Sequence, residues 1–121
     1  EAANARSLAL RFLNCSLNYT AGLRLGQELA IRKNTTPGLI AANDWLAVGL
    51  RAGLSSRFSA GLPDIQITSF DGLPITADSL LRIDSLVAPI QTIAADAVSE
   101  LHRLLTPAPG RIVRYPFHWR A

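Results

Sequence analysis

The stretch GLIAANDWLAVGLRAGL, residues 38–54, contains the change of pattern that decides the fold. A short apolar run at 39–42 has the length of a buried β-strand, and a longer apolar run with helical spacing follows Asn43 and Asp44. Asn and Asp are costly to bury but are favoured at helix N-termini, where their side-chain oxygens accept hydrogen bonds from free backbone N–H groups. The stretch therefore predicts a strand, a polar junction and a helix over 44–54.

The same alternation extends over the rest of the chain. Because parallel strands need crossover connections, usually helices, this order predicts an α/β domain with a parallel sheet flanked by helices. In such sheets, ligands bind beyond the carboxyl ends of the strands. Residues 14–17, 43–44 and 71–72 each end a strand and are expected together as a binding rim. Helices are predicted at 18–33, 44–54, 75–81 and 90–105, and strands at 7–14, 39–42, 65–70, 83–87 and 111–116.

The composition limits the class of protein. A chain of 121 residues, 49% hydrophobic and 17% charged, is long enough for one domain with a buried core. The single cysteine, Cys15, excludes an internal disulfide and favours a cytoplasmic protein. Two His argue against a metal cluster, so neither a metal nor a cofactor is expected. No apolar run is long enough to span a membrane. The 12 Lys and Arg residues are scattered, unlike those of a nucleic-acid-binding surface.

Four segments, taken in order, resemble the effector-binding core of LacI/GalR-type bacterial transcription regulators, over roughly residues 15–120. The family pattern has A-N-D after an apolar strand, P-D-I before a strand that ends in F-D, and a Thr pair shortly before an apolar helix. Asp84 and Ser85 stand where the Thr pair is usual, so Asp84 departs from the pattern. The segments are AANDWLAVGLRAGL (41–54), LPDIQITSFDGLP (62–74), RIDSLVAPIQTIAADAVSELHRLL (82–105) and RIVRYPFHWRA (111–121).

This resemblance implies a type I periplasmic-binding-protein-like fold, in which two lobes enclose a small ligand. Residues 1–82 and 106–121 would form most of the C-terminal lobe, and residues 83–105 would be an excursion into an incomplete N-terminal lobe. The family's first lobe, hinge helix and DNA-reading headpiece are expected outside this sequence, so DNA would be bound only through that missing headpiece.

The resemblance also assigns ligand-binding residues. Asn43 and Asp71 match family positions that bind ligand hydroxyls, and Leu17 and Ile90 match wall positions that are often aromatic. Each has a simpler interpretation: Asn43 and Asp44 can merely cap the following helix, Asp71 can merely form a turn, and the two aliphatic residues can belong to the core.

The resemblance places a homodimer interface on the helix that follows Asn43 and on the short helix after Asp71. Arg51 is expected close to this interface. The alternative is that the first of these helices has one wide stripe that faces the core. The interface residues would be Trp45, Val48, Ala52, Ile75 and Ser79.

The leading hypothesis is an effector-binding and dimerisation module of a transcription regulator, with a small polar metabolite, typically a sugar, as effector. The alternative is a periplasmic solute-binding protein of an ABC transporter or chemotaxis system, distinguished by a signal peptide in place of a helix-turn-helix. A third hypothesis, a small α/β enzyme or flavodoxin-like module, has neither a nucleophile arrangement nor a phosphate-binding loop to support it.

Overall fold

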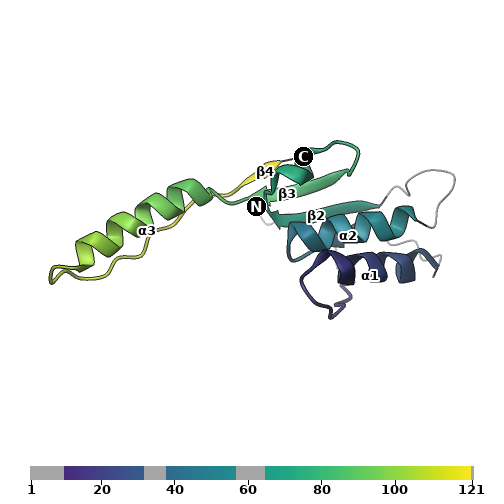
Figure 1. The fold of residues 1–121 in the computed structure, drawn as a ribbon, viewed down its shortest axis with the longest axis horizontal. Coiled ribbons are helices and arrows are strands. Elements are labelled where there is room, and N and C mark those ends of the chain that lie inside the picture. Colours follow the sequence, from purple (N-terminus) through teal and green to yellow (C-terminus); the bar gives the residue numbers. More distant parts are fainter. Residues whose placement is uncertain (1–9, 32–37, 57–64, 121) are drawn as a thin grey trace, which may run out of the picture.

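The computed structural model describes residues 10–31, 38–56 and 65–120 (Figure 1). A sheet with two packed helices forms the main body, and a third helix extends away from it. Along the chain the elements are α1 (Tyr19–Ile31), β1 (Gly38–Ile40), α2 (Asp44–Ser55), β2 (Gln66–Asp71), the 3-10 helix η1 (Pro74–Ala77), β3 (Ile83–Val87), α3 (Ile90–Leu104) and β4 (His118–Arg120).

The sheet is mixed, with strand order β1-β2-β3-β4. The first three strands are parallel: Leu39 lies opposite Ile67, which lies opposite Ile83 on the other side. β4 is antiparallel to β3, with Trp119 opposite Leu86. After α3 the chain runs back alongside the helix and so meets β3 from the opposite direction (Figure 1). The sheet therefore has an antiparallel edge strand, whereas the sequence predicted a parallel sheet.

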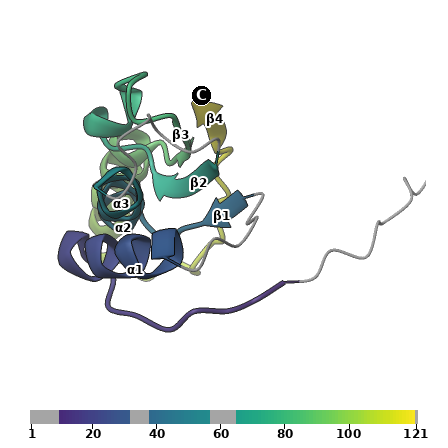
Figure 2. The ribbon, with the colours of Figure 1, turned by 90° about the vertical axis from the view of Figure 1, so that its right-hand side faces the viewer.

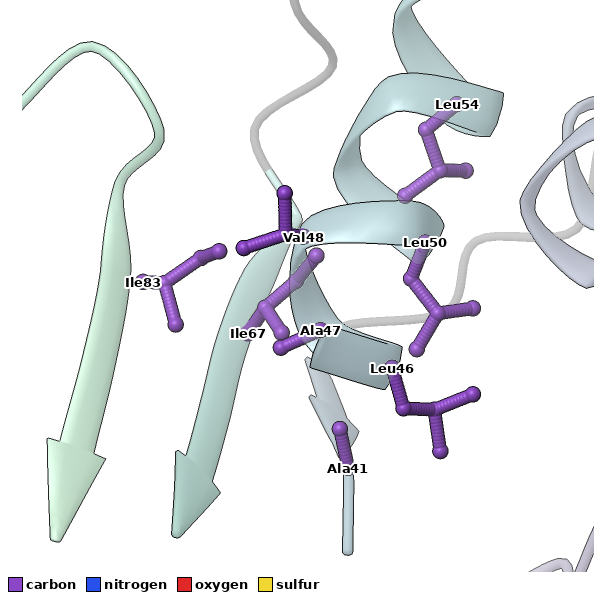
Figure 3. Packing of buried hydrophobic residues seen from close by; sticks show 8 residues of the cluster. All are labelled: Ala41, Leu46, Ala47, Val48, Leu50, Leu54, Ile67 and Ile83. Carbon is purple, nitrogen blue, oxygen red and sulfur yellow. The ribbon is translucent and has the colours of Figure 1, made fainter. Parts of the chain in front are cut away.

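The core lies between α2 and the sheet. α2 buries one apolar face on β2 and β3, where Ile67 and Ile83 point toward the helix (Figure 3). Successive strand residues point to opposite faces, so Ser69 and Ser85 share the buried face with these two isoleucines. Among the described residues, the buried hydrophobic side chains are those of Ala41, Leu46, Ala47, Val48, Leu50, Leu54, Ile67 and Ile83.

Four glycines set the contact between α1 and α2. Gly22 and Gly26 lie one turn apart on α1, and Gly49 and Gly53 have the same spacing on α2, so each pair occupies one face of its helix. A Cβ atom on Gly22 would lie only 2.3 Å from the carbonyl oxygen of Leu46. At the other three glycines, the nearest backbone oxygen would be 2.1 to 2.4 Å away. The two helix backbones therefore touch, which only glycine permits.

The helix α3 and the segment after it form an arm that projects from the sheet (Figure 1). The returning segment is held to α3 by polar contacts: the Tyr115 hydroxyl donates to Asp96 Oδ2 at 2.9 Å, and Arg111 Nε lies 2.9 Å from Glu100 Oε2. Arg103 donates to the same Glu100 carboxylate. None of the residues of α3, Ile90–Leu104, is buried.

These contacts change the pKa of two side chains of the arm, Glu100 and Tyr115. The hydrogen bond from Arg103, together with the charges of Arg103 and Arg111, lowers the pKa of Glu100 below its ordinary value of 4.5. Local desolvation and the hydrogen bond to Asp96 raise the pKa of Tyr115 above 10.0. The Glu100 carboxylate is therefore negatively charged at neutral pH, where it pairs with both Arg103 and Arg111.

Two predicted strands are wrong. Residues 10–14 of the strand expected at 7–14 are irregular, and they run below α1, away from the sheet (Figure 2); residues 7–9 lie outside the described part. Residues 111–116 are also irregular and follow α3, and the strand lies at 118–120 instead. A strand is stable only when another backbone satisfies its N–H and C=O groups, and residues 10–14 and 111–116 pair with no strand of the described part of the chain. The predicted helix at 75–81 is only the short η1, at 74–77.

Candidate functional site

Polar residues follow the carboxyl ends of β1 and β2, as the sequence predicts. Asn43 comes three residues after β1, and Asp71 is the last residue of β2. Because β1 and β2 are parallel neighbours, both residues lie at the same edge of the sheet. Asp71 is exposed and Asn43 half-buried, so neither is sealed in the interior.

Asn43 is the N-cap of α2 and also contacts the segment before α1. Its backbone is extended, with φ −154°, and its Oδ1 accepts from the N–H of Leu46 at 2.8 Å. Its Nδ2 donates to the carbonyl oxygen of Leu17 at 3.2 Å. An amide group has two N–H donors and two acceptor lone pairs, so one donor and one lone pair stay available. Asn43 can thus cap the helix and bind a ligand hydroxyl at once.

The other two predicted ligand residues lie near the same edge. Leu17 is held beside Asn43 by that hydrogen bond and is 60% exposed. Ile90 opens α3 three residues after Val87, which lies opposite Asp71 in the sheet, and Ile90 is 61% exposed. Neither aliphatic side chain belongs to the core, so the alternative interpretation of both as core residues is wrong.

Asp71 has an unusual backbone. Its φ is 111°, in a region that favours glycine, and the following Gly72 has φ 75°. A non-glycine residue held in such a conformation costs about 1–3 kcal/mol and persists only where the surrounding structure fixes it. A Cβ atom on Gly72 would lie 2.6 Å from Cγ1 of Val87, so this turn is pressed against β3.

Asp44 is fully buried and accepts hydrogen bonds from three elements. Its Oδ1 accepts from the hydroxyls of Ser69 on β2 and Ser85 on β3, the latter at 2.7 Å. Its Oδ2 accepts from the N–H of Leu73 and lies 3.5 Å from the hydroxyl of Thr76 in η1. These donors satisfy a buried carboxylate that would otherwise be very costly. Asp44 therefore joins α2, β2, β3 and η1.

Arg120 connects β4 to this group of residues. Its Nη2 donates to the carbonyl oxygen of Leu73 and, at 2.8 Å, to the Thr76 hydroxyl. The Thr76 hydroxyl in turn donates to the Leu73 carbonyl at 2.8 Å. The last strand of the chain is thereby tied to the loop that follows Asp71.

Sequence reasoning missed Ser69, Ser85 and Thr76 as parts of this site. A signal was available, because both serines occupy alternating strand positions that otherwise hold buried isoleucines. A hydroxyl at a core position requires a buried polar partner, and Asp44 is that partner in the structure. Asp84, which departs from the family pattern, accepts from Nε2 of Gln66 on the adjacent strand at 2.8 Å.

The five predicted dimer residues differ in exposure. Trp45 and Ile75 are 50% and 38% exposed, Ser79 is exposed and Ala52 is half-buried. Val48 is 7% exposed and packs in the core.

Arg51, which is expected close to the proposed dimer interface, is buried within this chain. It is 2% exposed, and its Nη2 donates to the carbonyl oxygens of Ile65 and Arg82 at 2.9 and 2.8 Å. Arg51 thus connects the middle of α2 to the segments that lead into β2 and β3.

Other kinds of site find no support among the described residues. No group of three or more His, Cys, Asp or Glu side chains there could hold a metal ion. Within the same ranges, no helix combines the length and apolarity that crossing a bilayer requires. His118, in β4, is exposed and lies opposite Val87.

Solved structures with the same arrangement include sugar-bound regulators. An uncharacterized protein from Actinobacillus succinogenes matches with a TM-score of 0.68 and 22% identity, over 86% of this chain and 38% of that one. A LacI family transcriptional regulator from Lactobacillus casei with bound sucrose gives 0.68 and 20%, over 86% and 39%. The Escherichia coli transcriptional repressor ascG gives 0.66 and 22%, over 82% and 37%.

The chain has the fold of these regulators. The type I periplasmic-binding-protein-like fold class expected from the sequence is confirmed, and the chain spans about two fifths of the length of the structures that it matches. No protein-family model matches the chain, and none of the curated proteins matches its sequence.

Proposed function

We propose that the chain is part of the effector-binding domain of a bacterial transcription regulator, and that it is not an enzyme. The observation that carries this proposal is the emergence of Asn43 and Asp71 at one edge of the sheet, both accessible to a ligand. A carboxylate and an amide side by side can bind several hydroxyl groups of one small molecule. Leu17 and Ile90 would supply the apolar wall.

A sugar is the proposed effector. Structural neighbours were solved with sucrose or glucose in a Lactobacillus casei regulator, and with lactose in one from Arthrobacter. Neither wall residue is aromatic, so this rim has no flat surface on which a ring could stack. Hydrogen bonds between the ligand hydroxyls and the side chains of Asn43 and Asp71 would therefore carry most of the recognition, with the Asp71 carboxylate as acceptor.

In the proposed regulator, this chain would be joined by a second lobe and a DNA-binding headpiece. Residues 83–87 pair with β2 within the sheet. We therefore place the start of the proposed excursion into a second lobe just after Val87, so that the arm of α3 packs in that lobe. DNA binding, and with it the cytoplasmic location of a regulator, belongs to the proposed whole protein, with DNA bound through a headpiece outside this chain.

A homodimer is proposed through the exposed surface of α2 and η1. Trp45 and Ile75 are the large apolar side chains exposed there, and Ser79 follows η1. Large aromatic residues are common at the centres of such interfaces. Because Val48 is buried in the core, it would support the interface from below without contacting the partner. The matched structures named as regulators favour this proposal over the periplasmic solute-binding alternative.

A titration tests the effector proposal. Sucrose, glucose and lactose are added separately to the ¹⁵N-labelled chain while its amide signals are followed. We expect weak binding of at least one sugar, with the largest shifts at Asn43, Asp71 and the adjacent residues. The variant Asp71→Ala should bind the sugar more weakly and so show smaller shifts at the same sugar concentration, and Asp78→Ala, a change at an exposed acid after η1, should keep the wild-type shifts. Shifts elsewhere, or no response to any of the three, would refute a sugar site at this rim.

A further inference from the structure

The conformation that presents Asp71 depends on the two amides that follow it. Gly72 N–H donates to the hydroxyl of Ser85 at 3.0 Å, and Leu73 N–H donates to Oδ2 of Asp44. Both donors are therefore fixed by side chains from other elements, one on β3 and one at the start of α2. This anchoring explains how Asp71 can keep a φ of 111°.

The two anchoring side chains also fix each other. A serine hydroxyl has one proton and can accept further hydrogen bonds. Ser85 uses that proton to donate to Oδ1 of Asp44 at 2.7 Å, which leaves its lone pairs directed at other donors, such as Gly72 N–H. Asp44 is held in turn by Ser69. The buried Asp44 carboxylate therefore stabilises the turn in two ways. It accepts from Leu73 N–H directly, and it fixes the Ser85 hydroxyl that accepts from Gly72 N–H.

Neither anchor can touch a ligand at the rim. The exposed fraction of both Asp44 and Ser85 is 0%, whereas Asp71 is exposed. Any influence of these two residues on ligand binding must therefore act through the turn.

We propose that Asp44 and Ser85 are positioning residues for Asp71: they hold the turn at 71–73 in the conformation that directs the Asp71 carboxylate toward a polyhydroxy ligand. The ligand part of this proposal rests on the proposed function, whereas the positioning part concerns the turn alone. A carboxylate binds hydroxyl groups well only in a narrow range of geometries. If the turn relaxes to an extended conformation, the affinity for the ligand should therefore fall although Asp71 is still present.

The structure supplies a matched pair of variants. Ser85→Ala removes the acceptor of Gly72 N–H, whereas Ser69→Ala removes an equally buried hydroxyl that also donates to Asp44 but forms no side-chain hydrogen bond with the described residues of the turn. Ser85→Thr keeps the hydroxyl. Asp44→Asn removes one of the two carboxylate oxygens that accept hydrogen bonds.

The first measurements need no ligand. In Ser85→Ala we expect the Gly72 amide to exchange with solvent about tenfold faster or more, because a lost hydrogen bond of this kind contributes on the order of a tenfold factor. The HN–Hα coupling of Asp71 should move toward the value of an extended residue. In Asp44→Asn we expect the Leu73 amide to exchange with solvent faster in the same way. Ser69→Ala and Ser85→Thr should leave both readouts near wild type.

Sucrose is the probe for the second measurement. Ser85→Ala should raise its Kd about tenfold in the wild-type chain, but not further in a chain that already carries Asp71→Ala, since the effect passes through that residue. Unchanged exchange and coupling in Ser85→Ala would overturn the positioning role, as would equal effects of Ser69→Ala. If sucrose fails to bind the wild-type chain, the proposed function fails for this probe, while exchange and coupling still decide the role of Ser85.

Discussion

The side chain of Asp71 is useful at the rim, but its backbone conformation is unfavourable. At φ 111° a residue with a Cβ atom is strained, whereas glycine is not. The variant Asp71→Gly should therefore raise the free energy of unfolding by about 1 kcal/mol, the relieved strain being partly offset by the greater chain entropy of glycine. Urea denaturation followed by tryptophan fluorescence measures this difference, and sugar titration should show weaker binding by the same variant.

A second aspartate provides the control at the same scale. Asp78 has an ordinary φ of −72°, and its Oδ1 accepts from the N–H of Leu80 at 2.9 Å. Asp78→Gly relieves no strain and removes this hydrogen bond, so it should lower stability. If both glycine variants shift the denaturation midpoint in the same direction, the strain assigned to Asp71 is wrong.

At the scale of helices, the contact between α1 and α2 should not tolerate a single methyl group. Gly22→Ala places a Cβ atom against backbone, which cannot rotate away as a side chain could. Alanine is the better helix former by about 1 kcal/mol, but separating the two helices costs about 3 kcal/mol, so the net change should be a clear loss of stability. Gly110→Ala is the control, because nothing lies within 4 Å of its added methyl group. Equal midpoints of thermal unfolding for the two variants would contradict this packing.

The polar contacts of the arm predict a response to acid. Glu100 has a lowered pKa in the folded chain, so its ion pairs stabilise the arm above the ordinary value of 4.5 and are lost as the pH falls through the lowered value. We expect the signals of Arg111 and its neighbours to move toward those of a free segment only below about pH 4.5. In Glu100→Gln the contact with Arg111 should already be lost at neutral pH, so the Arg111 signals should show no acid transition, while the Tyr115 hydroxyl still donates to Asp96. An identical acid transition in both chains would show that another group controls the arm.

Elements whose partners lie nearby in the chain could be predicted from the sequence. The Asn43–Asp44 junction fixed the start of α2, and the apolar runs around Ile67 and Ile83 fixed β2 and β3, because helix caps and alternating burial are local properties. Residues 10–14 and 111–116 have the same apolar character but form no strand, since pairing depends on a neighbour that local sequence does not specify. The rim at Asn43 and Asp71 could be predicted because it depends only on the order and direction of the strands. The hydrogen bonds of Asp44 could not, because they join residues that are distant in the chain and meet only in the folded domain.

At the scale of the whole molecule, the arm exposes apolar side chains that a stable protein normally covers. Ile90, Val98 and Leu101 of α3, and Leu105 directly after it, recur at helical spacing and are 61 to 76% exposed. Both outer strands of the sheet, β1 and β4, also have an unpaired edge within the described ranges. The isolated chain should therefore self-associate as its concentration rises, beyond a dimer formed by α2 and η1.

Light scattering over a range of concentrations tests this expectation directly. The paired change Val98→Glu and Leu101→Glu places charges on the exposed apolar stripe and should shift the chain toward smaller species. Ser99→Glu adds a charge at an exposed polar position of the same helix and should leave the distribution near that of the wild type. The reason is physical: burying a carboxylate in an apolar contact costs several kcal/mol, whereas adding one to a hydrated surface costs little. A wild-type chain that stays monomeric at all concentrations would show that the arm is stable in water without a partner.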